Sequence, residues 1–314
     1  MNIGKTQEKV LFQAGVLLLF FGLATSCISS RTMATVGSFG QSVTVVRDNI
    51  ENGYTLLDKQ YVLTRTAQMT NKFDPNTFRP DTVVSFFKRD EIALRLKLLD
   101  GLQVYADALA FILSDQGQND LDKNSKDFGK SLLQLNGDTL KTKFFKPISS
   151  PIPASDASII ATAVNGIGSL LLDYKKKQGL KSALTKADAP VHKLCELFML
   201  DIGKSNQEGI RGQLFITNQQ LQMEEYSFLV HNADKLGPIE KRAQIEKVMN
   251  LSSVRTKMDL VLQHTYASIQ QLLSIHSEMV QQLGEKNTFH LDSAIQSLIT
   301  EGNKIQKFYD DLNN

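Results

Sequence analysis

The side chains that come closest to a catalytic arrangement are His192, Cys195 and Glu196. A cysteine thiol becomes a nucleophile when a neighbouring base takes its proton, and a histidine three residues away on one helical face could be that base. A cysteine on a helix is more often a small buried apolar residue, and a histidine shortly after Pro190 fits a helix start. We therefore interpret this group as structural and predict that the chain is not an enzyme.

Nucleotide and metal motifs are incomplete. Gly-Lys-Ser/Thr triplets begin at Gly4, Gly129 and Gly203. A phosphate-binding loop needs a further glycine five positions earlier, where Asn124 and Phe198 precede the last two triplets, and the first triplet lies too near the start. The five histidines form neither a His-Glu-x-x-His nor a Glu-x-x-His pair. We therefore expect no cofactor and no metal.

Composition places the chain among ordinary globular proteins. Its 314 residues are 42% hydrophobic and 22% charged, which is enough apolar content to bury a core. The 35 basic and 33 acidic side chains leave a formal charge of +2, without long blocks of one sign. Nothing in this balance indicates nucleic acid as a partner.

The N-terminus has the profile of a signal peptide. Lys5 and Lys9 precede residues 10–23, an uncharged and mainly apolar run. As a helix this run rises about 21 Å, which is short of the hydrocarbon core of about 30 Å. We therefore expect removal of the segment and not a permanent span.

Small residues then lead directly to a cysteine, in the order Ala24, Thr25, Ser26 and Cys27. Over these first 27 residues the chain resembles the bacterial lipoproteins, whose signal peptide ends before the lipidated cysteine. The resemblance implies that residues 1–26 are removed and that Cys27 carries a thioether-linked diacylglycerol, usually with an acylated amino group. Two or three acyl chains form a stable membrane anchor. A plain signal peptide, or an uncleaved anchor with a chance cysteine, is the alternative.

The same resemblance predicts a location. Ile28, and not Asp, follows the cysteine, which in enteric-type bacteria favours the outer membrane on its periplasmic side. Cys195, the only other cysteine, would then have no disulfide partner within the chain. Residues 27–41, with Ser, Thr and Gly, read as a lipidated flexible leash.

The mature chain reads as helical throughout. Residues 191–237 and 239–314 contain no proline, and this permits long helices. A heptad seam runs from residue 198 to residue 233, with small residues at its middle that would let another helix approach closely: Ser205, Gly209 and Gly212. Its bulky positions include Ile216, Met223, Tyr226 and Val230.

A second seam lies after Pro238 and has a parallel apolar stripe beside it. The seam passes through Leu251, Val254, Met258, Val261, Thr265, Ser268, Leu272, Ile275 and Met279, and the stripe includes His276. So wide a face predicts contact with at least two other helices. A last helix follows through Leu291, Ile295, Leu298, Ile305 and Leu312.

The first half is also predicted to be helical. Residues 42–70 carry one apolar face, a turn follows at Asp74, and residues 81–113 form a helix capped by Asp81. We therefore predict an all-α bundle of five to seven helices, with two long antiparallel heptad-patterned helices. Residues 42–314 would form one elongated domain.

One segment could be more than core. Residues 157–172 carry no charge and are followed by three lysines at 175–177. Its apolar residues are Ile159, Ile160, Val164, Ile167, Leu170 and Leu171. Either the segment packs as a central helix or against a partner, or residues 157–177 enter a bilayer as in helical pore-forming toxins.

The expected function is that of a membrane-anchored bacterial envelope lipoprotein acting as a non-enzymatic helical scaffold or binding protein. Its partners would be the membrane, through the lipid on Cys27, and an envelope protein bound by helix faces. The alternative is a membrane-perturbing protein that uses residues 157–177. The sequence leaves the oligomeric state open.

Overall fold

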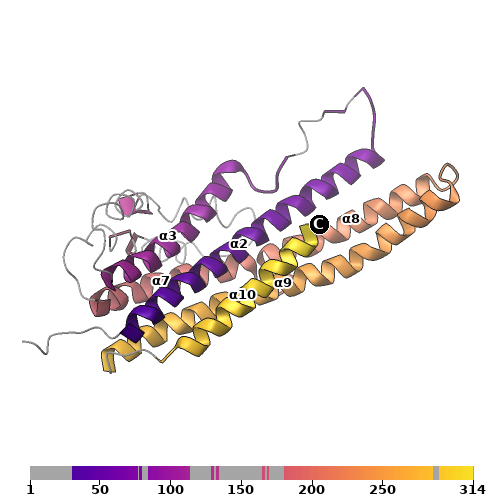
Figure 1. The fold of residues 1–314 in the computed structure, drawn as a ribbon. Coiled ribbons are helices and arrows are strands. Elements are labelled where there is room, and N and C mark those ends of the chain that lie inside the picture. Colours follow the sequence, from indigo (N-terminus) through magenta and orange to yellow (C-terminus); the bar gives the residue numbers. More distant parts are fainter. Residues whose placement is uncertain are drawn as a thin grey trace, which may run out of the picture.

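The computed structural model describes residues 30–76, 78–79, 84–113, 129–130, 132–133, 165–166, 168–169, 180–285 and 290–313. Six long helices and no strand lie in this part of the chain, so the predicted all-α bundle is confirmed. Two of the helices run antiparallel along the whole molecule: α2 (Ser30–Asn71) and α9 (Pro238–Glu285) (Figure 1).

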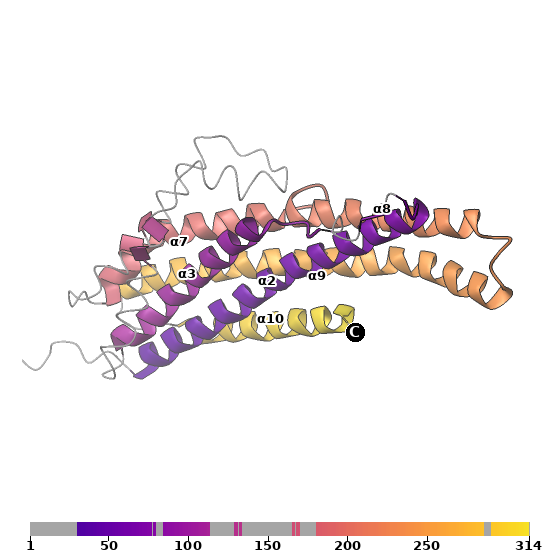
Figure 2. The ribbon, with the colours of Figure 1, turned by 90° about the horizontal axis from the view of Figure 1, so that it is seen from above.

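The bundle has two unequal halves (Figures 1 and 2). In the half where α2 begins, called the base, α2 and α9 are joined by α3 (Arg89–Leu113), α7 (Leu180–Ile202) and α10 (Asp292–Asn313). α8 (Gly209–His231) continues the direction of α7 into the other half, called the tip, where α2, α8 and α9 are the only described helices that lie side by side. Within the part of the chain that the structure describes, the bundle therefore changes from five helices to three along its length.

The core of the base confirms the two C-terminal stripes. On α9 the seam residues from Met258 to Met279 are buried, among them Thr265 and Ser268. On α10 the buried face is Leu291, Ile295, Leu298 and Ile305. Gly302 lets α10 approach α2 closely, because a Cβ there would meet the side chain of Val45, and its carbonyl oxygen accepts a hydrogen bond from Asn49 Nδ2 at 3.1 Å.

The predicted leash is wrong for residues 30–41, which form the first turns of α2. Val36 and Phe39 are fully buried there and continue the apolar face of residues 43–57. Asp292 fastens this end, since it accepts hydrogen bonds from Thr35 Oγ1 at 2.8 Å and from Arg31 Nη2 at 3.2 Å. The Ser, Thr and Gly content suggested flexibility, but apolar residues at helical spacing determined the structure.

The seam predicted over residues 198–233 is interrupted, because α7 ends at Ile202 and a turn of residues 203–208 precedes α8. Gly203 (φ 92°) and Gly209 (φ 56°) have left-handed backbones, which glycine adopts without the cost of a Cβ. Ser205 lies in the turn, and a Cβ on Gly212 would be 2.7 Å from the carbonyl carbon of Gln207. The small residues therefore accommodate this turn and not a second helix, which corrects the prediction of helix close-packing.

The other face of α8 is the buried one. The bulky seam residues Ile216, Met223, Tyr226 and Val230 are exposed. Leu214, Thr217, Asn218 and Leu221 are buried instead. The periodicity detected the apolar stripe correctly and assigned it to the wrong side, since half of the buried positions are polar and carry no hydropathy signal.

Two helix starts also differ from prediction. α3 begins at Arg89, where the backbone N–H of Lys88 donates to Glu91 Oε2 at 2.8 Å, and Asp81 lies outside the described residues. Pro190 is buried inside α7 and does not begin it. The turn at Asp74 is confirmed, since its Oδ1 accepts a hydrogen bond from the backbone N–H of Asn76 at 2.9 Å.

A buried ion pair lies where the two halves meet. Arg95 Nε and Nη2 donate to Asp201 Oδ2 and Oδ1, both at 3.0 Å, and both side chains are almost completely buried. The Cζ atom of the Arg95 guanidinium lies 4.5 Å from the ring centroid of Phe87 and 5.7 Å from the ring centroid of Tyr54. Burial raises the pKa of Asp201, and the Arg95 charge and hydrogen bonds oppose that shift.

We predict that Asp201→Asn lowers the free energy of unfolding by about 3–5 kcal/mol, because it leaves the Arg95 charge buried without its counter-ion. Urea denaturation followed by circular dichroism measures the change. The exposed pair of Arg242 and Glu246 supplies the control, and Arg242→Gln should cost no more than about 0.5 kcal/mol. Equal effects of the two changes would contradict a dominant role of the buried pair.

Candidate functional site

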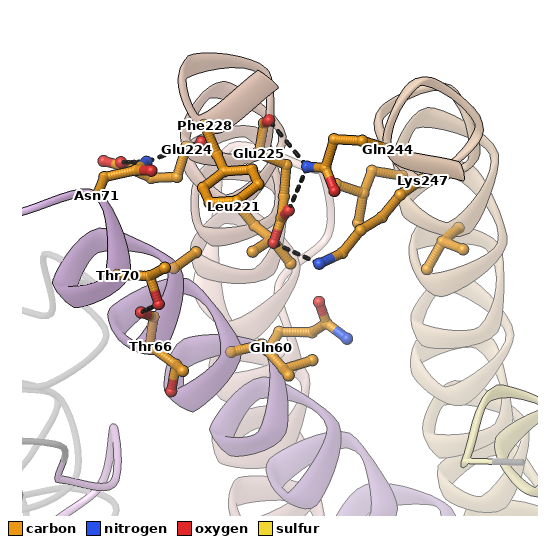
Figure 3. Close-up of a pocket in the computed structure, with 14 residues that line it drawn as sticks. Gln60, Thr66, Thr70, Asn71, Leu221, Glu224, Glu225, Phe228, Gln244 and Lys247 are labelled. Carbon is orange, nitrogen blue, oxygen red and sulfur yellow. Dashed lines mark hydrogen bonds and ion pairs between the residues drawn. The ribbon is translucent and has the colours of Figure 1, made fainter. Parts of the chain in front are cut away.

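The candidate site is a groove in the tip half, between α2 and α9 with α8 as its floor (Figure 3). Its volume is about 480 Å³. The apolar side chains that line it are Leu63, Ala67, Leu221, Phe228, Leu251 and Val254. The polar ones are Gln60, Thr66, Thr70, Asn71, Glu224, Glu225, Gln244 and Lys247.

On α2 the groove lies on the same helix face that α10 contacts in the base. Asn49 and Asn52 bond to Gly302 and Gln306 of α10, and a Cβ on Gly53 would lie 3.4 Å from Tyr309 Oη. Residues at the same heptad positions further along α2 line the groove. Gln60 and Ala67 lie one and two heptads after Gly53, and Leu63 and Thr70 lie two and three heptads after Asn49. The same face of α2 therefore contacts α10 first and lines the groove afterwards.

On α9, which runs in the opposite direction, the same relation holds towards lower numbers. Thr265 Oγ1 lies 3.4 Å from Tyr309 Oη, and Val261 and Ile305 line one small pocket between α9 and α10. Leu251 and Gln244 lie two and three heptads before Thr265, and Val254 and Lys247 lie one and two heptads before Val261. All four line the groove. α10 is described as far as Asn313, and no described helix covers the face between α2 and α9 beyond it.

Polar bonds attach each wall of the groove to its floor, α8. Glu225 is only 9% exposed. Its carboxylate accepts a hydrogen bond from Gln244 Nε2 at 2.8 Å and forms an ion pair with Lys247 Nζ at 2.8 Å. Across the floor, Asn71 Nδ2 donates to Glu224 Oε2 at 2.7 Å. Figure 3 shows these bonds at one end of the groove, with Gln60 at the other. The two carboxylates and one ammonium give the groove a formal charge of −1.

Sequence reasoning found part of this site. Leu251 and Val254 belong to the predicted seam of α9, and their incomplete burial marks where that seam lacks a covering helix. The residues contributed by α2 and α8 were missed. Ala, Thr, Gln and Asn on a helix give no signal that distinguishes a groove wall from an ordinary solvent-facing surface.

The structure separates the group that resembled a thiol nucleophile and its base. Cys195 is fully buried, and burial, with a contribution from Glu196, raises the pKa of its thiol to about 12. His192 Nε2 lies 2.9 Å from Ser277 Oγ, and Glu196 accepts from Lys193. Cys195 therefore behaves as a small core residue, as interpreted from the sequence.

Other predicted residues lie outside the described part of the chain, including Cys27, Ile159, Ile160, Val164, Ile167, Leu170, Leu171 and the lysines at 175–177. Of the uncharged segment, residues 165–166 and 168–169 are described and helical. A Cβ on Gly166 would meet Pro190, and one on Gly168 would meet the Gly129 backbone and Leu132. Both interpretations of the segment remain predictions.

Among the described residues, no helix is long and apolar enough to cross a bilayer. The same residues contain no group of three or more His, Cys, Asp and Glu side chains arranged to hold a metal ion.

His276 forms a buried titratable cluster in the base. Its Nε2 is hydrogen-bonded to Tyr105 Oη at 2.8 Å, and its Nδ1 lies 3.3 Å from Asp188 Oδ1. The ring of Phe39 lies 6.1 Å from the imidazole, centroid to centroid. Burial lowers the pKa of His276 to about 4; His192 adds to this shift and Asp188 opposes it. The imidazole is therefore neutral in the folded protein at pH 7.

No protein-family model, curated protein or solved structure matches this chain. The candidate site is therefore interpreted from its own geometry.

We predict that His276 makes the bundle less stable in acid. The unfolded side chain takes up its proton near pH 6.5 and the folded one near pH 4, so the unfolded state binds more protons between these values. Stability should fall by about 3 kcal/mol as the pH drops through this window and level off below it. Urea midpoints at pH 7 and pH 4.5 measure the loss.

His276→Gln should remove this component of the pH dependence, although it also lowers the stability at pH 7 by altering the core. His290→Gln is the control, because His290 is exposed. An unchanged pH slope in His276→Gln would show that other groups cause the acid sensitivity.

Proposed function

We propose that this protein is a lipid-anchored bacterial envelope protein that acts as a non-enzymatic helical scaffold and holds a helix-binding groove away from its membrane. The observation that carries this proposal is the open groove in the tip half, which lies at the opposite end of the bundle from Ser30. Cys27, the residue expected to carry the lipid, precedes Ser30 by three positions.

The dimensions of α2 support a spacer role. Three residues span at most about 10 Å, so an anchor on Cys27 would stay close to the base of the bundle. From Ser30 to Gln60 and Asn71, α2 rises about 45 Å and 60 Å at 1.5 Å per residue. An upright bundle would present the groove at that height, and the bonds of Asp292 to Arg31 and Thr35 stiffen the attachment.

The groove fits an amphipathic helix of a partner protein. Its α2 wall, from Gln60 to Asn71, is about 17 Å long, which corresponds to about three helical turns. Leu63, Ala67 and Leu251 would contact an apolar stripe of that helix, as α2 and α9 already contact α10. A basic side chain would suit the groove's formal charge of −1 at Glu224.

We predict that the wild-type protein, expressed in a bacterium with a working lipoprotein pathway, begins at Cys27 with added acyl mass and sediments with the outer membrane. Cys27→Ser should be released from membranes, because the acyl chains are the anchor. Intact mass and membrane fractionation measure both properties. Identical fractionation of the two proteins, or an uncleaved wild-type chain, would contradict the anchoring proposal.

We predict that a photoreactive residue at Leu63, which is 44% exposed in the groove, captures a partner protein in the native cell. The matched control is the same residue at Lys307, an exposed position on α10 outside the groove. Capture should also fall when Ala67→Trp fills the groove, because the bulky ring occupies the helix position. Equal capture at Leu63 and Lys307 would contradict a binding role of the groove.

A further inference from the structure

The outer face of the α8–α9 hairpin exposes a second apolar surface. This hairpin patch consists of Ile216, Met223, Tyr226 and Val230 on α8 with Ile245 and Met249 on α9. Their exposed fractions range from 43% to 68%. The patch is distinct from the groove, because the groove residues of α8, such as Leu221 and Phe228, lie on its inward side.

Two hydrogen bonds fix the register of the hairpin. Gln222 Nε2 donates to Val248 O at 3.1 Å, and Gln244 Nε2 donates to Glu225 O at 3.0 Å. Met223 and Tyr226 follow the bonded residues of α8 by one position, and Ile245 and Met249 follow those of α9 by one position, so all four lie at the same level of the hairpin. The patch therefore spans both helices.

The patch lacks charge along α8. From residue 216 to residue 231 the exposed residues of α8 are Ile216, Gln219, Gln220, Met223, Tyr226, Val230 and His231, none of them an acid, a lysine or an arginine. A helix face that serves only as a solvated surface normally carries charges. A face without them can meet an identical face without repulsion between like charges.

The size of the patch approaches what one partner contributes to a stable interface. A fully accessible large apolar side chain presents about 200 Å², so the six exposed fractions sum to on the order of 650 Å². Exposed apolar patches of this size on monomers are usually functional. A standard interface takes about 800 Å² from each partner.

We propose that the hairpin patch is the contact surface of a homodimer, in which α8 of one copy packs against α8 of a second. Ile216, Met223 and Val230 occupy one heptad position, and Gln219 and Tyr226 the other, which is the spacing that two paired helices require. The orientation rests on the proposed function: two copies anchored by Cys27 in one membrane must point the same way. Their α8 helices are therefore parallel, and Val230 meets Val230.

Sedimentation equilibrium of the mature chain carrying Cys27→Ser tests the dimer without a membrane. We expect a concentration-dependent doubling of mass. The double variant Met223→Lys with Tyr226→Lys should weaken association at least tenfold while the circular dichroism spectrum stays unchanged. The control is Leu63→Lys, which places a single lysine in the groove instead of on the hairpin patch. A monomeric parent chain, or dissociation by Leu63→Lys alone, would overturn the proposal.

Disulfide trapping tests the parallel arrangement in the anchored protein reconstituted in phospholipid vesicles. Val230→Cys should form a covalent dimer with copper phenanthroline as oxidant, whereas Asn303→Cys, on the exposed side of α10, should not. Cross-links found only between Ile216→Cys and Val230→Cys copies would overturn the parallel register. If the soluble chain dimerises but the wild-type protein is not anchored, the proposed function alone is refuted. If the wild-type protein is anchored but the soluble chain is monomeric, the dimer alone is refuted.

Discussion

The buried ion pair between Arg95 and Asp201 lies at the point where the described bundle changes from five helices to three. Asp201 lies in the last turn of α7, and Arg95 lies about two turns into α3, so their bidentate contact joins the end of α7 to the beginning of α3. The turn of residues 203–208 follows at once, and Arg211 at the start of α8 pairs with Asp259 of α9 at 2.9 Å. These two pairs direct α8 along α9, because a misplaced α7 end would leave two charges buried without partners.

Both candidate surfaces follow from having three helices in the tip. In the base, α10 covers the face between α2 and α9, and their apolar residues are buried. In the tip no described helix takes that position, so the same heptad positions line a groove. α8 contacts α2 and α9 with its inward face only, which leaves its outer apolar stripe exposed. α2 and α9 cover the inward face of α8, and no other described helix of the tip covers its outer face.

Polar side chains set the character of both halves. The base contains His276, Thr265 and Ser268 within its seam, and the pKa of His276 near 4 shows how strongly this core disfavours charge. The tip uses polar groups as walls, where Glu225 bonds to Gln244 and Lys247 across the α8–α9 contact. Polar side chains thus lie within a closed core in one half and line an open groove in the other.

The sequence by itself determined that the chain is helical, where α9 and α10 place their apolar stripes, and that Cys195 is a core residue, because these properties depend on local periodicity and on side-chain type. Only the tertiary structure decided which face of α8 is buried, that residues 30–41 belong to α2, and that the glycines at 209 and 212 accommodate a turn. A periodic stripe shows that a face is apolar and does not show which helix covers it. Burial depends on partners distant in the sequence, here α2, α9 and the point where α10 ends.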